Sequence, residues 1–188
     1  MKICKLNRSF FEKKSDELAK ELIGKILIKE ENGIKVGGKI VETEAYFTYN
    51  DKASHSFKRK MAKEFFENKK PGTSYVYLNY GMYYLFNIVS KNGAVLIRAL
   101  EPLYGLNIMK KNKNSNDIKD LCSGPGKLTV AMNINKEHHD LDLTKNKIYL
   151  LNSKNNEKIS KGKRIGISKD TNKLLRFYVK DNEFVSKK

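Results

Sequence analysis

The sequence has few cysteines and no long apolar run, and each shortage narrows what the chain can be. Its two cysteines, Cys4 and Cys122, lack the C-x-x-C spacing of a redox or metal motif, so we expect a reduced, intracellular protein without a disulfide framework. No segment approaches the roughly 20 apolar residues that a membrane span needs. The first residues, MKICKLNRSFFEKK, lack the apolar centre of a signal peptide, because the two phenylalanines lie among charges.

Acidic residues are also scarce. The chain has 21 Asp and Glu against 38 Lys and Arg, which gives a formal net charge of +17 and an isoelectric point near 9.7. A domain this basic favours a polyanionic partner, either a nucleic acid or an anionic membrane surface. The many Lys, Asn and Ile residues also fit a biased genome, so charge alone leaves the partner open. The length of 188 residues predicts one domain, 1–188, and the 39% hydrophobic content is sufficient for a packed core.

The first half of the chain predicts a helix followed by a β-hairpin. Residues 15–24 read as an amphipathic helix with Ser15 as its N-cap. The Asn-Gly pair at 32–33 predicts a tight turn before a strand over 34–46. The Gly-Gly pair at 37–38 indicates a bulge or bend inside that strand.

The middle of the chain predicts an antiparallel meander, because three segments rich in β-branched and aromatic residues are joined by tight turns. Pro102 predicts the end of the third strand. The polar connection at 47–72 is predicted to hold one short helix near 62–67, and its length indicates a functional or mobile loop. The meander strands cover residues 73–79, 82–89 and 94–101. Later elements are helices near 106–111 and 127–132 and strands near 147–151, 164–167 and 174–179.

Strand alternation places Glu42, Glu44 and Tyr46 on one face of the strand over 34–46. Two carboxylates and a phenol on a shared face suit general acid–base chemistry. The alternative from these residues alone is a solvated strand face. The long loop that follows favours a site, because functional residues concentrate where strands end beside loops.

Four other features of the sequence bear on function. Tyr80 lies at the tip of a predicted hairpin, where it is either a wedge for a nucleic-acid base stack or a ring folded back over the sheet. His55 alone fits a surface or packing histidine. His138 and His139 are adjacent and lack a third ligand at metal-site spacing, so we interpret them as part of a charged loop. The SGPGK segment lacks P-loop spacing, although it could place backbone N–H groups near a phosphate.

Six segments in order make the pattern specific: VETEAY, ASHS, KPGTSYVYLNYGMYYLFNI, VLIRALEP, LCSGPGKL and LRFYV. Together they resemble the alkyladenine (3-methyladenine, methylpurine) DNA glycosylase family over nearly the whole chain. The resemblance implies a mixed α/β (α+β) fold, a single domain around a curved antiparallel β-sheet with flanking helices and a DNA-inserting β-hairpin. It also implies base excision repair, in which alkylated or deaminated purines are flipped from duplex DNA and released by hydrolysis.

The resemblance implies a role for each matched position. Glu44 matches the carboxylate that activates the water, and Arg98 matches the arginine beside that water and the target phosphate. Tyr80 matches the residue that intercalates into DNA.

The remaining matched positions form the base pocket. Tyr46, His55 and Tyr77 match the residues that sandwich the flipped base. Ala53 matches the position whose backbone contacts the base. Asn87 matches the residue that reads the purine edge and disfavours the 2-amino group of guanine.

The same resemblance sets further expectations. No lysine occupies a matched position suited to a Schiff base, so we expect a monofunctional enzyme without lyase activity. We expect no cofactor and no metal, a monomer, duplex DNA with a damaged purine as partner, and a location in the bacterial cytoplasm at the nucleoid. The alternatives are a catalytically silent DNA-binding module that uses the same basic surface and, more remotely, a small-molecule transferase on a similar fold.

One segment departs from the family pattern. Where the family commonly has an R-x-T-x-R-N-like run, this chain has FKRKMAKEFFEN, so the DNA contacts of the loop at 57–68 stay open. The basic run at 58–60 fits a solvated face at least as well as a binding patch. Tyr49 and Phe57 are expected near the pocket, where they would alter the choice of substrate.

Overall fold

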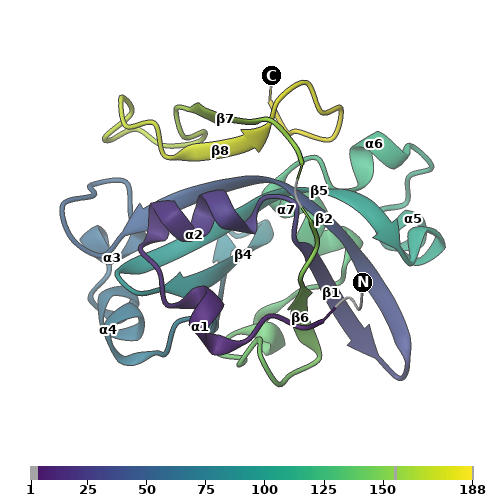
Figure 1. Ribbon diagram of the computed structural model, residues 1–188, viewed down its shortest axis with the longest axis horizontal. Coiled ribbons are helices and arrows are strands. Elements are labelled where there is room, and N and C mark those ends of the chain that lie inside the picture. Colours follow the sequence, from purple (N-terminus) through teal and green to yellow (C-terminus); the bar gives the residue numbers. More distant parts are fainter. Residues whose placement is uncertain (1–3, 155, 188) are drawn as a thin grey trace.

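One antiparallel sheet organises the protein (Figure 1). The computed structural model describes residues 4–154 and 156–187. In this part of the chain six strands follow the order β3-β4-β5-β2-β1-β6, while β8 pairs with β2 and with β7. The strands are β1 (Ile26–Glu31), β2 (Ile34–Phe47), β3 (Ser74–Asn79), β4 (Tyr83–Ser90), β5 (Gly93–Tyr104), β6 (Ile148–Leu151), β7 (Ile159–Gly162) and β8 (Arg176–Val179).

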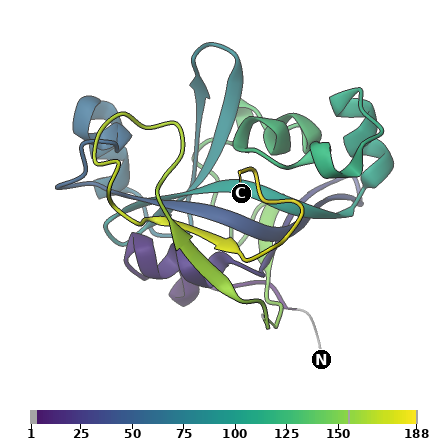
Figure 2. The same ribbon diagram turned by 90° about the horizontal axis from the view of Figure 1, so that it is seen from above.

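Helices cover both faces of this sheet. Figure 2 shows α1 and α2 on one face, with α5, α6 and α7 on the other, where the β3–β4 hairpin also stands up from the body. The helices are α1 (Arg8–Phe11), α2 (Ser15–Leu22), α3 (His55–Lys58), α4 (Lys60–Asn68), α5 (Leu106–Lys113), α6 (Ile118–Leu121) and α7 (Pro125–Ala131), with a 3-10 turn, η1 (Lys136–His138). Among the described residues, none of these helices has the length and apolar character to span a bilayer.

The second half of β2 is buried on both faces. On one face Thr43 lies under α2, where its hydroxyl donates a hydrogen bond to the Ala19 carbonyl at 2.8 Å. Glu42 and Glu44 alternate to the other face, and both are fully buried. The first half of β2 pairs with β1 and this second half pairs with β8, so the carboxylates lie in the interior of the sheet.

Irregular pairing between β2 and β5 redirects side chains near the carboxylates. The register shifts between Gly37 and Gly38, which confirms the predicted bulge, and shifts again on either side of Glu42. On β5, Ala99 pairs with Glu42 and Ile97 pairs with Thr43, which leaves Arg98 as an extra residue. A bulge re-aims the side chain that it contains, so this irregularity explains how Arg98 reaches the carboxylate face.

Much of the predicted architecture is confirmed, including the mixed α/β class, the curled antiparallel sheet and the meander of β3, β4 and β5. Asn32 and Gly33 both adopt positive φ angles, 51° and 77°, as a primed hairpin turn requires. The predicted helices near 106–111 and 127–132 correspond to α5 and α7.

Two local predictions are wrong, namely the N-cap at Ser15 and the strand end at Pro102. Ser15 does not cap α2; the N-cap is Lys14, and the buried Ser15 hydroxyl instead donates to the Tyr46 carbonyl at 3.0 Å. Pro102 does not end its strand, because β5 continues to Tyr104. Pro102 pairs with Gly38 beside the bulge, where a missing backbone N–H is tolerated.

Two segments were also assigned the wrong structure. The expected strand at 164–167 is a loop, since the Ile165 N–H donates to a carboxylate rather than to a neighbouring strand. The connection at 47–72 contains two helices, α3 and α4, rather than one. A four-residue helix such as α3 is too short to leave a periodic apolar pattern, whereas α4 packs Phe66 against the buried Tyr75 ring.

We predict that Gly38→Ala destabilises the protein by about 1–3 kcal/mol. A Cβ at this position would lie 2.1 Å from the Glu101 carbonyl oxygen, so the β2–β5 pairing must shift to admit it. Denaturant unfolding measures the change. Gly124→Ala is the matched control, because its Cβ would make only ordinary contacts with the Lys127 side chain at 3.7 Å. Equal stability of the two variants would show that the bulge does not need glycine.

Candidate active site

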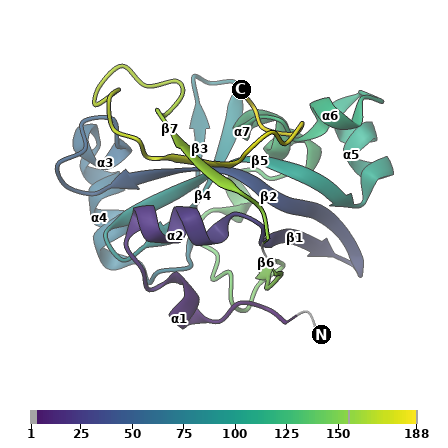
Figure 3. The same cartoon turned by 45° about the horizontal axis from the view of Figure 1, so that its top comes forward.

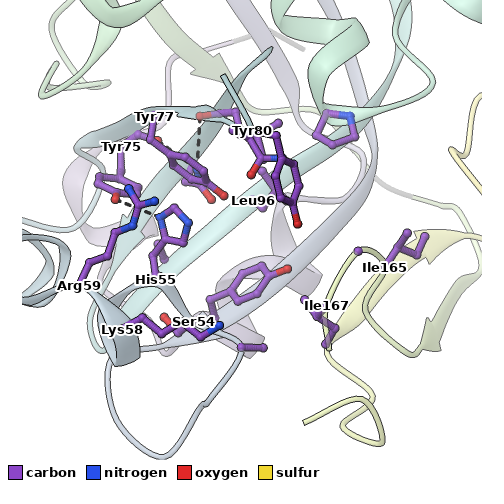
Figure 4. Close-up of a pocket in the computed structure, with 18 of the residues that line it drawn as sticks. Ser54, His55, Lys58, Arg59, Tyr75, Tyr77, Tyr80, Leu96, Ile165 and Ile167 are labelled. Atoms are coloured by element: carbon purple, nitrogen blue, oxygen red, sulfur yellow. Dashed lines mark hydrogen bonds between the residues drawn. The ribbon is translucent and has the colours of Figure 1, made fainter. Parts of the chain in front are cut away.

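A cavity of about 750 Å³ opens beside the β3–β4 hairpin, within the size range of small-molecule pockets. Figure 4 shows His55 and Tyr77 on one side of this cavity and Ile165 and Ile167 on the other. The cavity brings together nearly all residues predicted from the sequence. Those that line it are Tyr46, Ala53, His55, Tyr77, Tyr80, Asn87 and Arg98.

Glu44 is the exception, because its carboxylate lies fully buried directly behind the cavity wall. Three groups hold it, and all three belong to cavity-lining residues. The Tyr46 hydroxyl donates to Oε2 at 2.7 Å, and the Ile165 N–H donates to Oε1 at 2.6 Å. Arg98 Nη1 lies 3.4 Å from Oε2. Both carboxylate oxygens are therefore fixed in direction, and the carboxylate is one layer away from the cavity.

Opposing effects set the acidity of Glu44. Burial raises the pKa of its carboxyl, while Arg98 and the hydrogen bonds from Ile165 and Tyr46 lower it, and the balance lies above the ordinary value. Glu42 adds a further increase in the pKa of Glu44 through like-charge repulsion. A carboxylate with a raised pKa is a stronger base than one in water, which suits proton abstraction.

Arg98 bridges the two carboxylates of β2. Its Nε lies 3.3 Å from Glu42 Oε1, and its Nη2 donates to the Ser186 hydroxyl at 3.3 Å. Glu42 also forms an ion pair with Arg176 Nη1 at 3.0 Å and accepts a hydrogen bond from the Ser186 N–H at 2.8 Å. The guanidinium of Arg98 is thus anchored on one side and faces Glu44 and the cavity on the other.

Aromatic side chains form one wall of the cavity. The rings of His55 and Tyr77 have centroids 4.0 Å apart, and the Tyr75 hydroxyl lies 3.3 Å from His55 Nδ1. Burial, with the nearby charges of Arg59 and Lys58, lowers the pKa of His55 to about 4, so its imidazole is neutral at physiological pH. His55 and Tyr77 already touch, so they make a single wall and leave no space for a base between them.

Tyr46, Asn87 and Ala53 complete the lining of the pocket. The Arg164 guanidinium lies over the Tyr46 ring, 4.6 Å from its centroid. Asn87 is buried, and its amide nitrogen donates to the Tyr75 carbonyl at 3.1 Å, which fixes the orientation of the side chain. The Ala53 N–H donates to Asp51 Oδ1 at 3.3 Å.

Tyr80 occupies the outermost point of the β3–β4 hairpin. Its side chain is 82% exposed, so the ring is not folded back over the sheet. Its φ angle is 50°, a left-handed conformation that costs a bulky residue roughly 1–2 kcal/mol. Glycine or asparagine would fit this turn more easily, and a large apolar ring held outward at such a cost indicates a function for the ring.

Sequence reasoning missed the groups that hold the site together. Asp51, Arg164, Arg176 and Ser186 contact Glu42, Tyr46 or Ala53, yet none belongs to a pattern with a recognised chemical role. The only local signal was the LRFYV segment, which contains Arg176. Contacts between segments that are far apart in the sequence leave no local pattern. Figure 3 shows one such case, in which the 163–175 loop that contains Arg164 lies at the α3 end of the sheet.

Other predicted features lie away from the cavity or at its rim. Tyr49 and Phe57 are exposed and are not part of the cavity lining, so their expected effect on the choice of substrate stays a prediction. Lys58 and Arg59 of the basic run do line it. His139 stacks on Phe65 with ring centroids 4.6 Å apart. Within residues 4–154 and 156–187, no group of three or more His, Cys, Asp or Glu side chains is placed to hold a metal ion.

Comparison with known proteins identifies the family. Residues 9–183 match the family model described as methylpurine-DNA glycosylase (MPG). The chain is 44% identical to a Francisella tularensis (strain SCHU S4 / Schu 4) protein over 93% of this chain and 95% of the relative. It is also 44% identical to a Clostridium tetani protein over 98% and 100% of the two chains. Both relatives bear the name "Putative 3-methyladenine DNA glycosylase". This chain belongs to the methylpurine-DNA glycosylase family.

Proposed function

We propose that this protein excises alkylated purines from duplex DNA by hydrolysing the N-glycosidic bond with a water that Glu44 activates. The observation that best supports the proposal is the buried Glu44 carboxylate, which three lining residues of an aromatic cavity hold in place. Family membership and the names of the relatives support DNA repair glycosylase activity on alkylated bases. Such an enzyme would work in the bacterial cytoplasm, at the nucleoid.

The target base must leave the DNA stack to reach the cavity, at a cost of a few kcal/mol that is lower for damaged pairs. The exposed ring of Tyr80 would fill the gap that the base leaves. Exposed cations at the cavity rim suit the flanking phosphates, and their contacts would make binding fall steeply with salt. These rim residues are Lys52, Lys58, Arg59 and Lys169.

The aromatic wall accounts for a preference for alkylated purines. A base in the cavity would stack between Tyr46 and the wall of His55 and Tyr77. A purine nucleotide alkylated at N3 or N7 carries a positive charge, and aromatic faces attract cations by about 0.5–2 kcal/mol. The neutral imidazole of His55 adds no opposing charge. Asn87 lines the cavity with its amide nitrogen already engaged, and we expect it to exclude the 2-amino group of guanine.

The reaction follows from the carboxylate and the cation. As the glycosidic bond breaks, its electron pair leaves with the base, and the sugar acquires oxocarbenium character, as in glycoside hydrolysis. The negative charge of Glu44 stabilises this cation, and Glu44 takes the proton from the water whose oxygen bonds to C1′. Since Glu44 is covered, the water would reach Oε2 between the Tyr46 hydroxyl and Arg98, both of which line the cavity.

The product would be an abasic site in an intact strand. The lysines that line the cavity, Lys52, Lys58 and Lys169, are exposed at its rim, and no recorded contact of these side chains reaches Glu44 or Arg98 within the described residues. This placement supports a water nucleophile over a Schiff base, and hence no lyase step.

The first prediction of this function concerns Glu44→Gln, which should lower base release by about 10²–10⁴-fold while duplex binding stays near the wild-type level. The assay uses duplexes with 3-methyladenine-type lesions, 1,N6-ethenoadenine or hypoxanthine, and abasic sites are revealed by alkali. The pKa of Glu44 is raised in the folded state, so ionising the carboxylate above that pKa opposes folding. Neutral Gln removes this cost but leaves one of the three donors that face the carboxylate without an acceptor, so melting curves at pH 8 establish that the variant is folded before release is compared.

Three outcomes separate the alternatives. Release by the wild type and not by Glu44→Gln supports the proposal. Lesion binding without release from any duplex by the wild type would leave the silent binding module. Strand cleavage without alkali would contradict the absence of a lyase step.

The second prediction concerns pH. Activity requires ionised Glu44, so kcat/KM should fall as the pH drops through the raised pKa of this carboxyl. The acidic limb is the part of the profile of kcat/KM against pH where activity rises as Glu44 ionises. Arg98 lowers the pKa of Glu44, so Arg98→Met should move this limb to higher pH, while Arg98→Lys should keep it closer to wild type. Profiles measured on ethenoadenine duplexes test this. An unmoved limb in Arg98→Met would mean that another group is the base.

The third prediction concerns the hairpin tip. Tyr80→Ala should weaken binding to lesion duplexes by about 5- to 100-fold, because it removes one base-stacking contact. Tyr80→Phe retains the ring and should bind like wild type. The residue is exposed, so neither variant should change the melting temperature. If Tyr80→Ala binds and reacts like Tyr80→Phe, the ring does not act as a wedge.

A further inference from the structure

Two buried charges join the loops that flank the cavity. Arg164, from the 163–175 loop, and Asp51, from the loop after β2, have fully buried side chains. Their contact is bidentate, with Nη1–Oδ2 at 2.6 Å and Nη2–Oδ1 at 2.7 Å. Bidentate arginine–carboxylate pairs are both stronger and more directional than single hydrogen bonds.

Each partner also contacts a part of the site. Arg164 Nη1 donates to the Ala45 carbonyl at 3.0 Å, and its guanidinium lies over the Tyr46 ring. Asp51 Oδ2 accepts from the Phe47 N–H at 3.1 Å, and Oδ1 accepts from the Ala53 N–H at 3.3 Å. The pair therefore ties the end of β2 to both loops at once.

The residue that follows Arg164 makes the connection to the chemistry. The Ile165 N–H donates to Glu44 Oε1 at 2.6 Å, and this hydrogen bond lowers the pKa of Glu44. Arg164 and Ile165 are adjacent, so fixing the guanidinium on Asp51 and Ala45 fixes the amide within one residue. A loop without this anchor would leave Oε1 without its donor.

We propose that Arg164 and Asp51 are positioning residues, which lock the Ile165 amide onto Glu44 and the Tyr46 ring into the plane against which the flipped base stacks. This inference rests on the proposed function of Glu44 as the base. The pair acts through Glu44, Tyr46 and Ala53 rather than on the substrate, since neither Arg164 nor Asp51 lines the cavity.

The role predicts a specific change in the pH profile. Loss of the Ile165 hydrogen bond and of the Arg164 charge both raise the pKa of Glu44, so the acidic limb must move to higher pH. In these variants the other groups that face Glu44 stay in place, apart from the Tyr46 ring, which loses its contact with Arg164. They are Arg98 of β5, Glu42 and Tyr46 of β2, Tyr77 of β3 and Arg176 of β8, whose guanidinium binds Glu42.

The test compares Arg164→Lys, Arg164→Met and Asp51→Asn with wild type in single-turnover excision of ethenoadenine at saturating enzyme. Arg164→Met and Asp51→Asn should slow excision by about 10- to 100-fold, the effect of a small misplacement of reacting groups. The acidic limb of Arg164→Met should lie above that of wild type, and the limb of Asp51→Asn, which keeps the Arg164 charge, should lie between the two. Arg164→Lys retains the positive charge but cannot make the bidentate contact with Asp51, so its acidic limb should lie between those of Arg164→Met and wild type.

Arg8 provides the matched control. It also pairs with a carboxylate, Asp142 at 2.5 Å, and donates to the Pro71 carbonyl, but it lies outside the cavity lining. Arg8→Met should lower thermal stability and leave the acidic limb unmoved. Melting curves identify the fraction of each variant that is folded, and rates are compared per folded protein.

The outcomes distinguish this inference from the proposed function. If wild type releases no base, the proposed function fails first. If wild type is active and folded Arg164→Met or Asp51→Asn has a wild-type rate and limb, the positioning role is wrong. If both Arg164→Met and Asp51→Asn unfold, the folded Arg164→Lys variant provides the test. A wild-type rate and a wild-type acidic limb in Arg164→Lys would overturn the inference.

Discussion

The structure depends on compensating two carboxylates that β2 places in the interior of the sheet. A buried charge is costly unless it is paired and hydrogen-bonded, and removing one partner leaves the other uncompensated. Glu42 and Glu44 are both fully buried, and guanidinium groups surround them from separate segments. Arg98 comes from a bulge in β5, Arg176 from β8 and Arg164 from the 163–175 loop. Bringing these charges together determines how the bulge, the last strand and the C-terminal residues pack.

The two carboxylates differ in their surroundings, although they are two residues apart on one strand. Glu42 contacts two guanidinium groups and the Ser186 N–H, and its partners turn it away from the cavity. Glu44 contacts one guanidinium at the longer distance of 3.4 Å, and its other partners are neutral. Environments that separate two neighbouring carboxylates in this way assign them different tasks. Glu42 holds Arg98, whereas the pKa of Glu44 stays raised, which suits the role of base proposed for it.

Sequence patterns predicted the features that depend on local rules. Alternation and turn residues predicted β1 to β5, and the ordered motifs predicted the residues that now line one cavity. Long-range pairing was not predictable in this way. Nothing near Arg164 indicates that its guanidinium binds Asp51, 113 residues away, or that the next amide meets Glu44. The same contacts explain why 164–167 is a loop and not a strand, since the Arg164 guanidinium and the Ile165 N–H both bind carboxylates.

With Glu44 as the proposed base, folding and catalysis would make opposite demands on this carboxyl, and the site would be a compromise between them. Burial favours the protonated carboxyl, and each unit by which its pKa rises corresponds to about 1.4 kcal/mol against ionisation in the folded state. A fully uncompensated carboxyl would be a strong base that is seldom ionised, whereas a tightly paired one would be ionised and weak. The Arg98 guanidinium, the Tyr46 phenol and the Ile165 amide reduce the effect of burial without cancelling it. The Glu44 site therefore depends on incomplete compensation, which must be held by rigid partners because small movements of a guanidinium or an amide would shift the balance either way.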